Sequence, residues 1–191
     1  GLDQPYFIRF GTWLWSLAQG DLGTSIFTGL PVTTLIGQRL EPTLALTLCT
    51  LVVAVALAVP LGVIAAARAG GWIDRVVMAV SVVGFSVPVV VLAYGLVLLF
   101  AVQLEWLPVQ GYTPLKEGFW PFLRHMILPS VALGLTYMAL IARITRASML
   151  DVLSQDYVRT AHAKGLAPGT VLVRHALKNA AVPIVTIIGI G

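Results

Sequence analysis

The residues best suited to bind another molecule lie in a short basic segment, residues 156–179, between two strongly apolar stretches. Gly165 and Pro168, in its middle, predict a break between two short helices. Such a segment suits non-covalent docking to a partner, although an ordinary positively charged loop would look much the same. Its cationic side chains are Arg159, Lys164, Arg174 and Lys178, and its one acid is Asp156.

We expect this segment to fold as two helices joined by an exposed elbow. A helix over residues 154–164 would end at Gly165, which suits a left-handed cap, with Lys164 favourably placed in the last turn of the helix dipole. Pro168 would then lie in the first turn of the second helix. The elbow, residues 163–169, holds small side chains and one leucine, so another protein could approach its backbone closely.

Composition places the chain in a membrane. It has 191 residues, of which 58% are hydrophobic and 10% charged, and its mean hydropathy is +0.93. Ordinary soluble domains carry about 25% charged residues. The net charge of +4 could suggest a nucleic-acid partner, but the cations lie in short loops between apolar stretches, so nucleic acid is excluded as a partner. The lone Cys49 lies in an apolar run and reads as a small buried residue.

We therefore predict an all-α integral membrane protein, a polytopic helical bundle. The uncharged stretches between Glu41 and Arg68 and between Arg75 and Glu105 each exceed the about 20 residues that cross a bilayer. Pro60 and Pro88 lie inside spans and should kink them. The predicted spans are residues 43–67, 76–104, 128–149 and, as a partial fourth, 180–191.

The first 42 residues are predicted to form an external interfacial region. Apolar residues recur there at helical spacing, and Trp13 and Trp15 suit a membrane interface. Pro31 is expected to open a second short helix that runs to Leu40. The helically spaced residues are Tyr6, Phe10, Trp13, Leu14 and Leu17.

Orientation follows from the cationic residues of the connections. Residues 68–75 and 150–179 are the richer in Lys and Arg and are separated by two crossings, so both are predicted to be cytoplasmic. Residues 1–42 and 105–125 then lie outside. We expect Arg143 and Arg146, at the inner end of the third span, to contact lipid headgroups or the neighbouring loop.

Neither catalysis nor cofactor chemistry is indicated. The sequence has no GxxxxGK[ST], Gly-x-Ser-x-Gly or HExxH motif, so we expect no enzyme activity, no cofactor and no metal. Polar residues inside the spans could line a pathway, but interhelical packing is the simpler interpretation. The pathway candidates are Ser86, Tyr94, Thr136 and Tyr137.

The stretch RASMLDVLSQDYVRTAHAKGLAPGTVLVRHALKNAAVPIVT resembles the cytoplasmic loop of permease subunits of bacterial ABC importers. The family pattern is Glu-Ala-Ala, three residues, Gly, nine residues, then Ile-x-Leu-Pro, and Ala161, Gly165 and Leu177 keep its register. The departures are typical of the dipeptide, oligopeptide and nickel branch, which GDLGTS with PVTTLIGQRLEPTLALT also resembles. They are Arg159, Thr160, His175 and Lys178.

The resemblance covers nearly the whole chain and implies a six-span subunit of the bacterial inner membrane that here lacks its first span and its end. Residues 43–191 would be the permease domain, with a coupling loop at 150–179. It further implies three kinds of partner: cytoplasmic ATPase subunits, which hydrolyse the ATP, a second permease, which in that branch is usually a paralogue, and an extracytoplasmic substrate-binding protein. The coupling residues would be Thr160, Ala161, Lys164, Gly165, Leu166 and Ala167, with Arg159 and His175 as further candidates.

Two other classes stay open at this point. A secondary transporter driven by an ion gradient would place ionisable residues at midspan, and the first two predicted spans have none. A membrane scaffold without transport would have no ATPase partner. Dipeptides, oligopeptides, glutathione and nickel chelates are all carried by permeases of this kind, so the sequence does not name the cargo.

Overall fold

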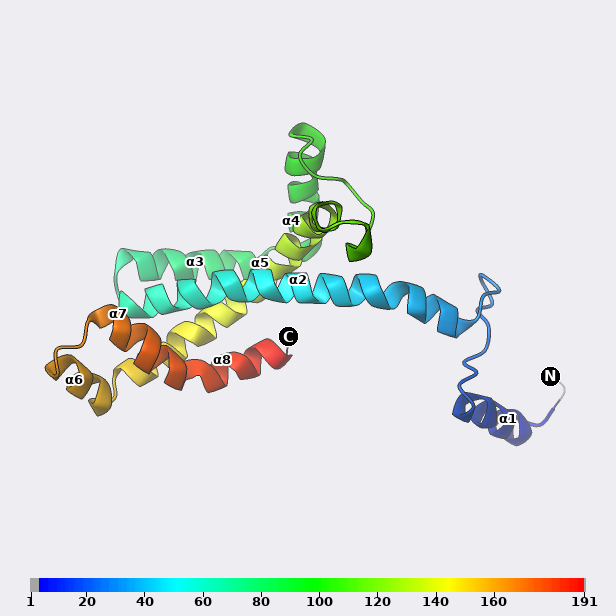
Figure 1. Cartoon of the computed structure of the whole chain (residues 1–191), viewed down its shortest axis with the longest axis horizontal. Helices are drawn as coiled ribbons and strands as arrows, with labels where there is room; N and C mark the ends of the chain where they lie inside the picture. The colour runs from blue at the N-terminus through cyan, green and yellow to red at the C-terminus, as the bar shows by residue number, and fades with distance from the viewer. Residues whose placement is uncertain (1–3, 191) are drawn as a thin grey trace. The chain divides into compact units, whose positions relative to one another are not determined.

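The computed structural model describes residues 4–190, with His162 described by its backbone alone, and its regular elements are helices. The predicted all-α membrane fold is thereby confirmed. One isolated bridge, between Thr24 and Pro31, is the only β pairing among the described residues. The chain divides into two compact units, Gly1–Ala45 and Leu46–Gly191, which are described separately (Figure 1).

The first unit holds α1 (Tyr6–Ala18), a turn, and the start of α2 (Val32–Ala67). The turn is fixed by short bonds: the Gly23 amide donates to Asp21 Oδ1 at 2.8 Å, and the Val32 amide donates to the Gly23 carbonyl at 2.9 Å. The sequence predicted a short helix to Leu40 and a separate span from residue 43. The structure joins them in one helix, which continues through Pro42 without a break.

The second unit holds the rest of α2 and all the later helices. Its crossing helices besides α2 are α3, α4 with its π-helical continuation η1, α5 and α8. The bounds are α3 Trp72–Ser86, α4 Val89–Leu96, η1 Val97–Gln103, η2 Leu115–Glu117, α5 Phe119–Leu153, α6 Asp156–Ala163, α7 Pro168–Thr170, η3 Val171–Leu177 and α8 Lys178–Ile190.

Among the described residues, three helical segments are long and apolar enough to cross a membrane: Val32–Ala67, Phe119–Leu153 and Pro168–Ile190. The stretch predicted as a single span over residues 76–104 is instead two helices, α3 and α4 with η1, bent by 100°. Val87 has an extended ψ of 124°, as the residue before a proline prefers. Because Pro88 also lacks an amide hydrogen, the helix breaks there rather than bending smoothly.

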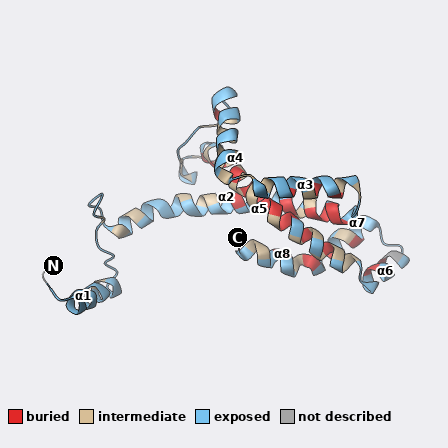
Figure 2. Ribbon diagram, turned by 180° about the vertical axis from the view of Figure 1, so that it is seen from behind, coloured by how far each residue is buried: buried red, intermediate tan, exposed pale blue. Residues whose placement is uncertain are grey.

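Small residues let α2 and α5 approach closely. Buried residues recur on α2 at every fourth position, and they contact Met138, Ile141 and Ala142 of α5. A Cβ atom on Gly62 would lie 2.6 Å from the Thr145 Cβ and 2.7 Å from the Ala142 carbonyl oxygen. Figure 2 shows the buried residues gathered where these helices pack. The recurring residues are Ala54, Ala58, Gly62 and Ala66, a spacing typical of close-packed membrane helices.

The contact at Gly62 can be tested by adding one methyl group. We expect Gly62→Ala to destabilise the chain by about 1–3 kcal/mol, because the new Cβ overlaps the α5 backbone. Gly37→Ala is the matched control, since it lies in the same helix with nothing within 4 Å of its Cβ. Thermal unfolding in detergent would measure both. An equal melting temperature for the two variants would contradict the close approach.

A second cluster holds α8 against the C-terminal ends of α2 and α5. Val63 and Ala66 of α2, Met149 of α5, and Ala176 and Ala180 are all buried in it. The ends of α2 and α5 therefore meet the start of α8, and Figure 1 shows α6 and α7 extending beyond that end of the second unit. The basic segment thus rests on the helix bundle itself.

Candidate functional site

The basic segment forms the predicted elbow. The first helix, α6, starts two residues later than predicted and ends in a glycine cap, in which the Leu166 amide donates to the Ala161 carbonyl at 3.3 Å. Gly165 has φ +79°, the left-handed conformation expected of it. Pro168 begins α7, also as predicted. The backbone conformation of the elbow follows from these two residues.

Most of the predicted coupling residues lie on the exposed surface of the elbow, and Leu166 is 39% exposed although it is apolar. Ala161 is the exception. It is 8% exposed and packs with Val158 and Val171, so it lies beneath this surface rather than on it. Its position three residues after Val158 turns it toward η3. The exposed residues, which we call the elbow surface, are Thr160, Lys164, Gly165, Leu166 and Ala167.

The two further candidates differ in their placement. Arg159 is exposed, and its Nη1 lies 3.8 Å from a carboxylate oxygen of Asp156, a solvated pair of little strength. His175 is half-buried in η3. Arg159 is therefore available to a partner, whereas His175 is partly covered by its own chain.

Contacts with the bundle hold the elbow firmly. Beneath it, Val158 and Val171 pack with Leu153, the last residue of α5. Beside it, the Asn179 side-chain amide donates to the Tyr157 hydroxyl at 2.8 Å, which joins α6 to α8. The elbow is therefore attached to both α5 and α8.

One partly buried ion pair connects α5 to α3. The Arg146 guanidinium donates from Nε to Asp74 Oδ1 at 2.5 Å and from Nη2 to Oδ2 at 2.7 Å. The Gly70 amide, in the turn after α2, donates to the same carboxylate at 2.9 Å. Asp74 is only 4% exposed. A single carboxylate thus joins α5, α3 and the α2–α3 turn.

Sequence reasoning placed Arg146 near headgroups or the neighbouring loop, and it did not single out Asp74. The structure places Arg146 against the start of α3, while the guanidinium carbon of Arg143 lies 5.9 Å from the centre of the Phe85 ring. The available signal was weak: Asp74 is the one acid between Arg68 and Arg75. Nothing in the sequence alone joins it to an arginine 72 positions away.

The four pathway candidates fall into two pairs. The hydroxyls of Ser86 and Thr136 donate back to carbonyls of their own helices, Val82 at 2.8 Å and Ala132 at 3.4 Å, as in packed helices. Tyr94 is 72% exposed and Tyr137 is 41% exposed. The tyrosines are therefore the better placed of the four to meet a molecule outside this chain.

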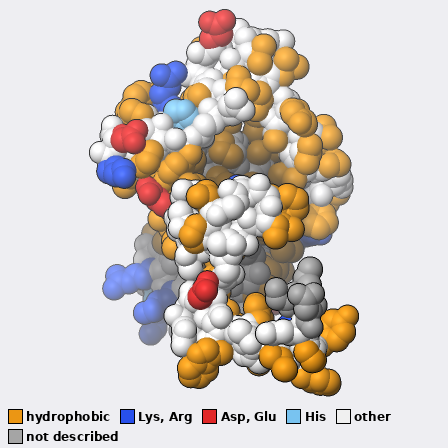
Figure 3. Space-filling model, turned by 90° about the vertical axis from the view of Figure 1, so that its right-hand side faces the viewer, with side chains coloured by type: hydrophobic (Ala, Val, Ile, Leu, Met, Phe, Trp, Pro, Cys, Tyr) orange, Lys and Arg blue, Asp and Glu red, His pale blue; other side chains and the backbone are white. Residues whose placement is uncertain are grey.

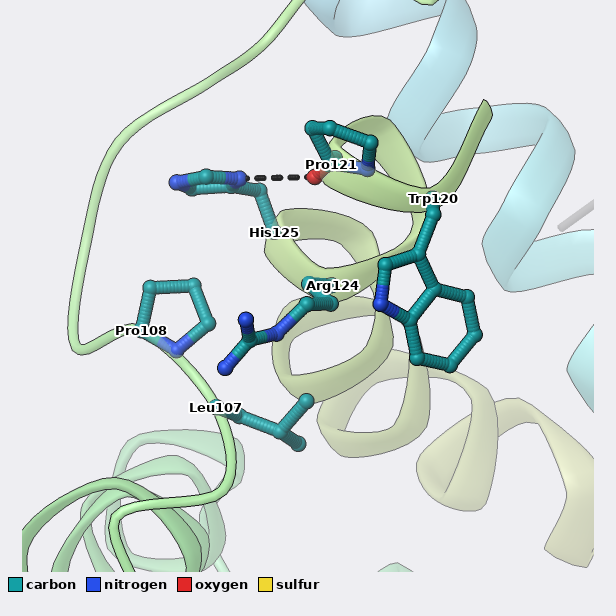
Figure 4. A pocket seen from close by; sticks show the side chains of 6 residues that line it. All are labelled: Leu107, Pro108, Trp120, Pro121, Arg124 and His125. Atoms are coloured by element: carbon teal, nitrogen blue, oxygen red, sulfur yellow. Dashed lines mark hydrogen bonds between the residues drawn. The ribbon is translucent and has the colours of Figure 1, made fainter. Parts of the chain in front are cut away.

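The connection between η1 and α5, residues 104–118, forms a largely apolar hollow at the start of α5. A cavity of about 300 Å³ is lined by six residues, drawn in Figure 4. His125 Nδ1 lies 2.9 Å from the Pro121 carbonyl, and Arg124 Nη2 donates to the Trp106 carbonyl at 2.8 Å. The His125–Pro121 contact lies within α5, whereas the bond to Trp106 and a 3.3 Å contact between His125 Nδ1 and Thr113 Oγ1 fix the loop to α5. The lining residues are Leu107, Pro108, Trp120, Pro121, Arg124 and His125.

Residues 58–191 match the family described as "Binding-protein-dependent transport system inner membrane component". The whole chain is similar to a probable peptide ABC transporter permease of Sinorhizobium fredii, with 52% identity over 190 residues and 61% of that protein covered. It is 37% identical to a dipeptide transport permease of Alkalihalophilus pseudofirmus (63% covered) and 42% identical to a glutathione transport permease of Pectobacterium atrosepticum (60% covered). All of this chain aligns with each of the three relatives. It spans about three fifths of the length of these curated relatives.

Proposed function

Because this chain belongs to the family of inner-membrane components of binding-protein-dependent transport systems, we propose that it is a permease subunit of an ABC importer. In this proposal it forms half of a translocation pathway for peptides, beside a second permease. Support for the cargo class comes from the similar proteins, which are named for peptides, dipeptides and glutathione. The family is one of transport proteins rather than enzymes, and we assign ATP hydrolysis to separate partner subunits.

The elbow carries the proposal of an ATPase partner. It combines an exposed, close-approach surface with a firm connection to the spans: Gly165 and Leu166 are exposed, while Val158 packs on the end of α5. A loop whose only role is to carry positive charge would not require these buried contacts with α5. We propose that an ATPase subunit binds the elbow surface and that its ATP-driven movement displaces α5 and α8.

The proposed sidedness agrees with the arrangement along α5. Arg146 contacts Asp74 of α3, and His125, 21 residues earlier, shares a cavity with Val97 of η1. That separation corresponds to about 32 Å of helix, close to the hydrocarbon thickness of a bilayer. The bent pair of α3 and α4 with η1 thus contacts α5 at two points separated by that length, as expected if the pair is one broken span. This favours one side for residues 68–75 and 150–179 and the other for residues 105–125.

Reconstitution tests the function directly. The permease would be purified with its co-expressed partners and assayed in proteoliposomes with the cognate substrate-binding protein and labelled peptides. We expect a P-loop ATPase to co-purify and uptake to require ATP. Uptake that follows a proton gradient instead would establish a secondary transporter, and an absence of both ATPase and uptake would leave a scaffold.

Cysteine labelling tests the sidedness separately. In a Cys49→Ala background, Glu117→Cys and Lys164→Cys each place one exposed thiol on a connection between spans. We expect a membrane-impermeant maleimide to label position 117 in spheroplasts and position 164 only after the membrane is opened. The reverse labelling pattern would place the elbow outside the cell, where a cytoplasmic ATPase subunit could not bind it.

A further inference from the structure

Helix α1 has one narrow polar stripe and a wide apolar surface. At 100° per residue, Arg9, Thr12 and Ser16 fall within about 60° of the helix circumference. The other positions, which are apolar or small, cover about 220°. The segment contains no acidic residue. This arrangement is typical of helices that lie along a membrane surface.

The apolar surface of α1 is uncovered in its own unit. None of its residues is buried, and Phe7 is 90%, Tyr6 83% and Trp15 67% exposed. Figure 2 shows α1 almost entirely in the colour of exposed residues. The polar stripe is satisfied locally: the Thr12 hydroxyl donates to the Ile8 carbonyl at 2.9 Å, and the Arg9 guanidinium carbon lies 5.9 Å from the Tyr6 ring centre. What covers the aromatic side chains must come from outside the unit.

A lipid surface fits this helix better than a protein partner does. One packed helix covers an apolar stripe of about 100°, whereas the apolar arc of α1 is about twice as wide. Acyl chains can surround such an arc from several sides. Tryptophan, tyrosine and phenylalanine beside one arginine also match the acyl–headgroup boundary, where rings are half-immersed and cations meet phosphates.

Two further observations fix how α1 would meet the bilayer. Its 13 residues extend about 20 Å, too short to cross the hydrocarbon core of about 30 Å, so it must lie along the surface. It is also tethered to the membrane, because the connection over residues 19–31 joins it to α2, whose charge-free stretch begins after Glu41. Figure 3 shows one face of the chain, with many hydrophobic side chains at its right-hand and lower edges and most of the charged side chains toward the left.

We infer that α1 lies parallel to the bilayer in the outer-leaflet interface, with its apolar arc among the acyl chains. Leu14 and Phe7 lie at the centre of that arc, and Thr12 and Ser16 lie on the opposite stripe, which faces headgroups and water. The choice of leaflet rests on the proposed sidedness. Contact with lipid itself depends on neither the cargo nor the ATPase.

Single-site fluorescence can test the inference on the whole permease complex. Cys49 is the only cysteine of this chain, so Cys49→Ala, in a complex whose other cysteines are also replaced, permits one NBD label at Phe7→Cys, Leu14→Cys, Thr12→Cys or Ser16→Cys. The labelled complex would be reconstituted in phosphatidylcholine vesicles with and without nitroxide lipid labelled near the headgroup. We expect lipid quenching at positions 7 and 14 to be at least about threefold stronger than at 12 and 16, and iodide quenching to show the opposite order.

Two outcomes would overturn the inference. Equal lipid quenching at all four positions would show that the helix has no fixed immersed face. Protection of positions 7 and 14 from both nitroxide lipid and iodide would show that a protein surface, such as the second permease, covers the arc. Since quenching is read without transport, failure of the proposed import activity would leave this result interpretable.

Discussion

Replacing Gly165 by valine is expected to reduce ATP-dependent uptake at least about tenfold and to prevent stable binding of the ATPase subunit. A Cβ at Gly165 would meet nothing within 4 Å, so the side chain creates no clash inside the chain. Its φ of +79° costs a non-glycine residue about 1–2 kcal/mol, which is local strain at an exposed site. The larger loss is expected at the interface, where branched methyl groups keep a partner from the backbone of the elbow surface.

A matched control separates the interface from the strain. Gly29 has a similar φ of +70° and equally open surroundings, but it lies in the first unit, on the side predicted to be external. We expect Gly29→Val to carry the same conformational cost and to retain ATPase subunits during purification. The measurements are co-purification of the ATPase and ATPase stimulation by cargo-loaded binding protein. Full co-purification of the Gly165→Val variant would refute the docking role of the elbow.

The parts of the structure that could be predicted are those set by local rules. The elbow follows from Gly165 and Pro168, because a glycine favours the left-handed cap and a proline favours the first turn of a helix. The apolar helices could be predicted from the length of the charge-free stretches, because about 20 such residues are needed to cross a bilayer. Pro88 was expected to kink a span, and the 100° break is the same effect in a stronger form, since Val87 also left the helical conformation.

The parts that could not be predicted depend on residues far apart in the chain. The burial of Ala161 depends on η3, which returns over α6 and places Val171 against it. The close contact at Gly62 requires Thr145 of another helix. Periodicity shows which face of a helix is apolar. It does not determine which two helices will pack together, or which residues along them will come into contact. The ion pair of Asp74 and Arg146 is the clearest case.

Breaking that ion pair on one side is expected to have a large effect on stability and transport. Arg146→Met leaves the buried Asp74 carboxylate without its partner, a loss that typically costs about 3–5 kcal/mol, and Asp74→Asn leaves the partly buried Arg146 guanidinium unpaired. We expect the low end, about 3 kcal/mol, because the Arg146 side chain remains 25% exposed. Asp156→Asn is the control: it removes the same kind of charge from the exposed pair with Arg159 and should change stability little.

The double variant Asp74→Asn with Arg146→Met distinguishes stabilisation from transmission. With neither charge present, no unpaired ion is buried, so we expect much of the lost melting temperature to return. If the pair also carries motion from the elbow through α5 to α3, the number of peptides imported per ATP hydrolysed should stay low in that stable protein. Recovery of this ratio together with stability would limit the pair to a structural role. The Asp74 carboxylate also accepts a hydrogen bond from the Gly70 amide, and the oxygen of an asparagine at that position would accept a weaker, uncharged bond. The α2–α3 turn should therefore loosen in the two Asp74→Asn variants, and hydrogen exchange at that turn would report the loss separately from transport.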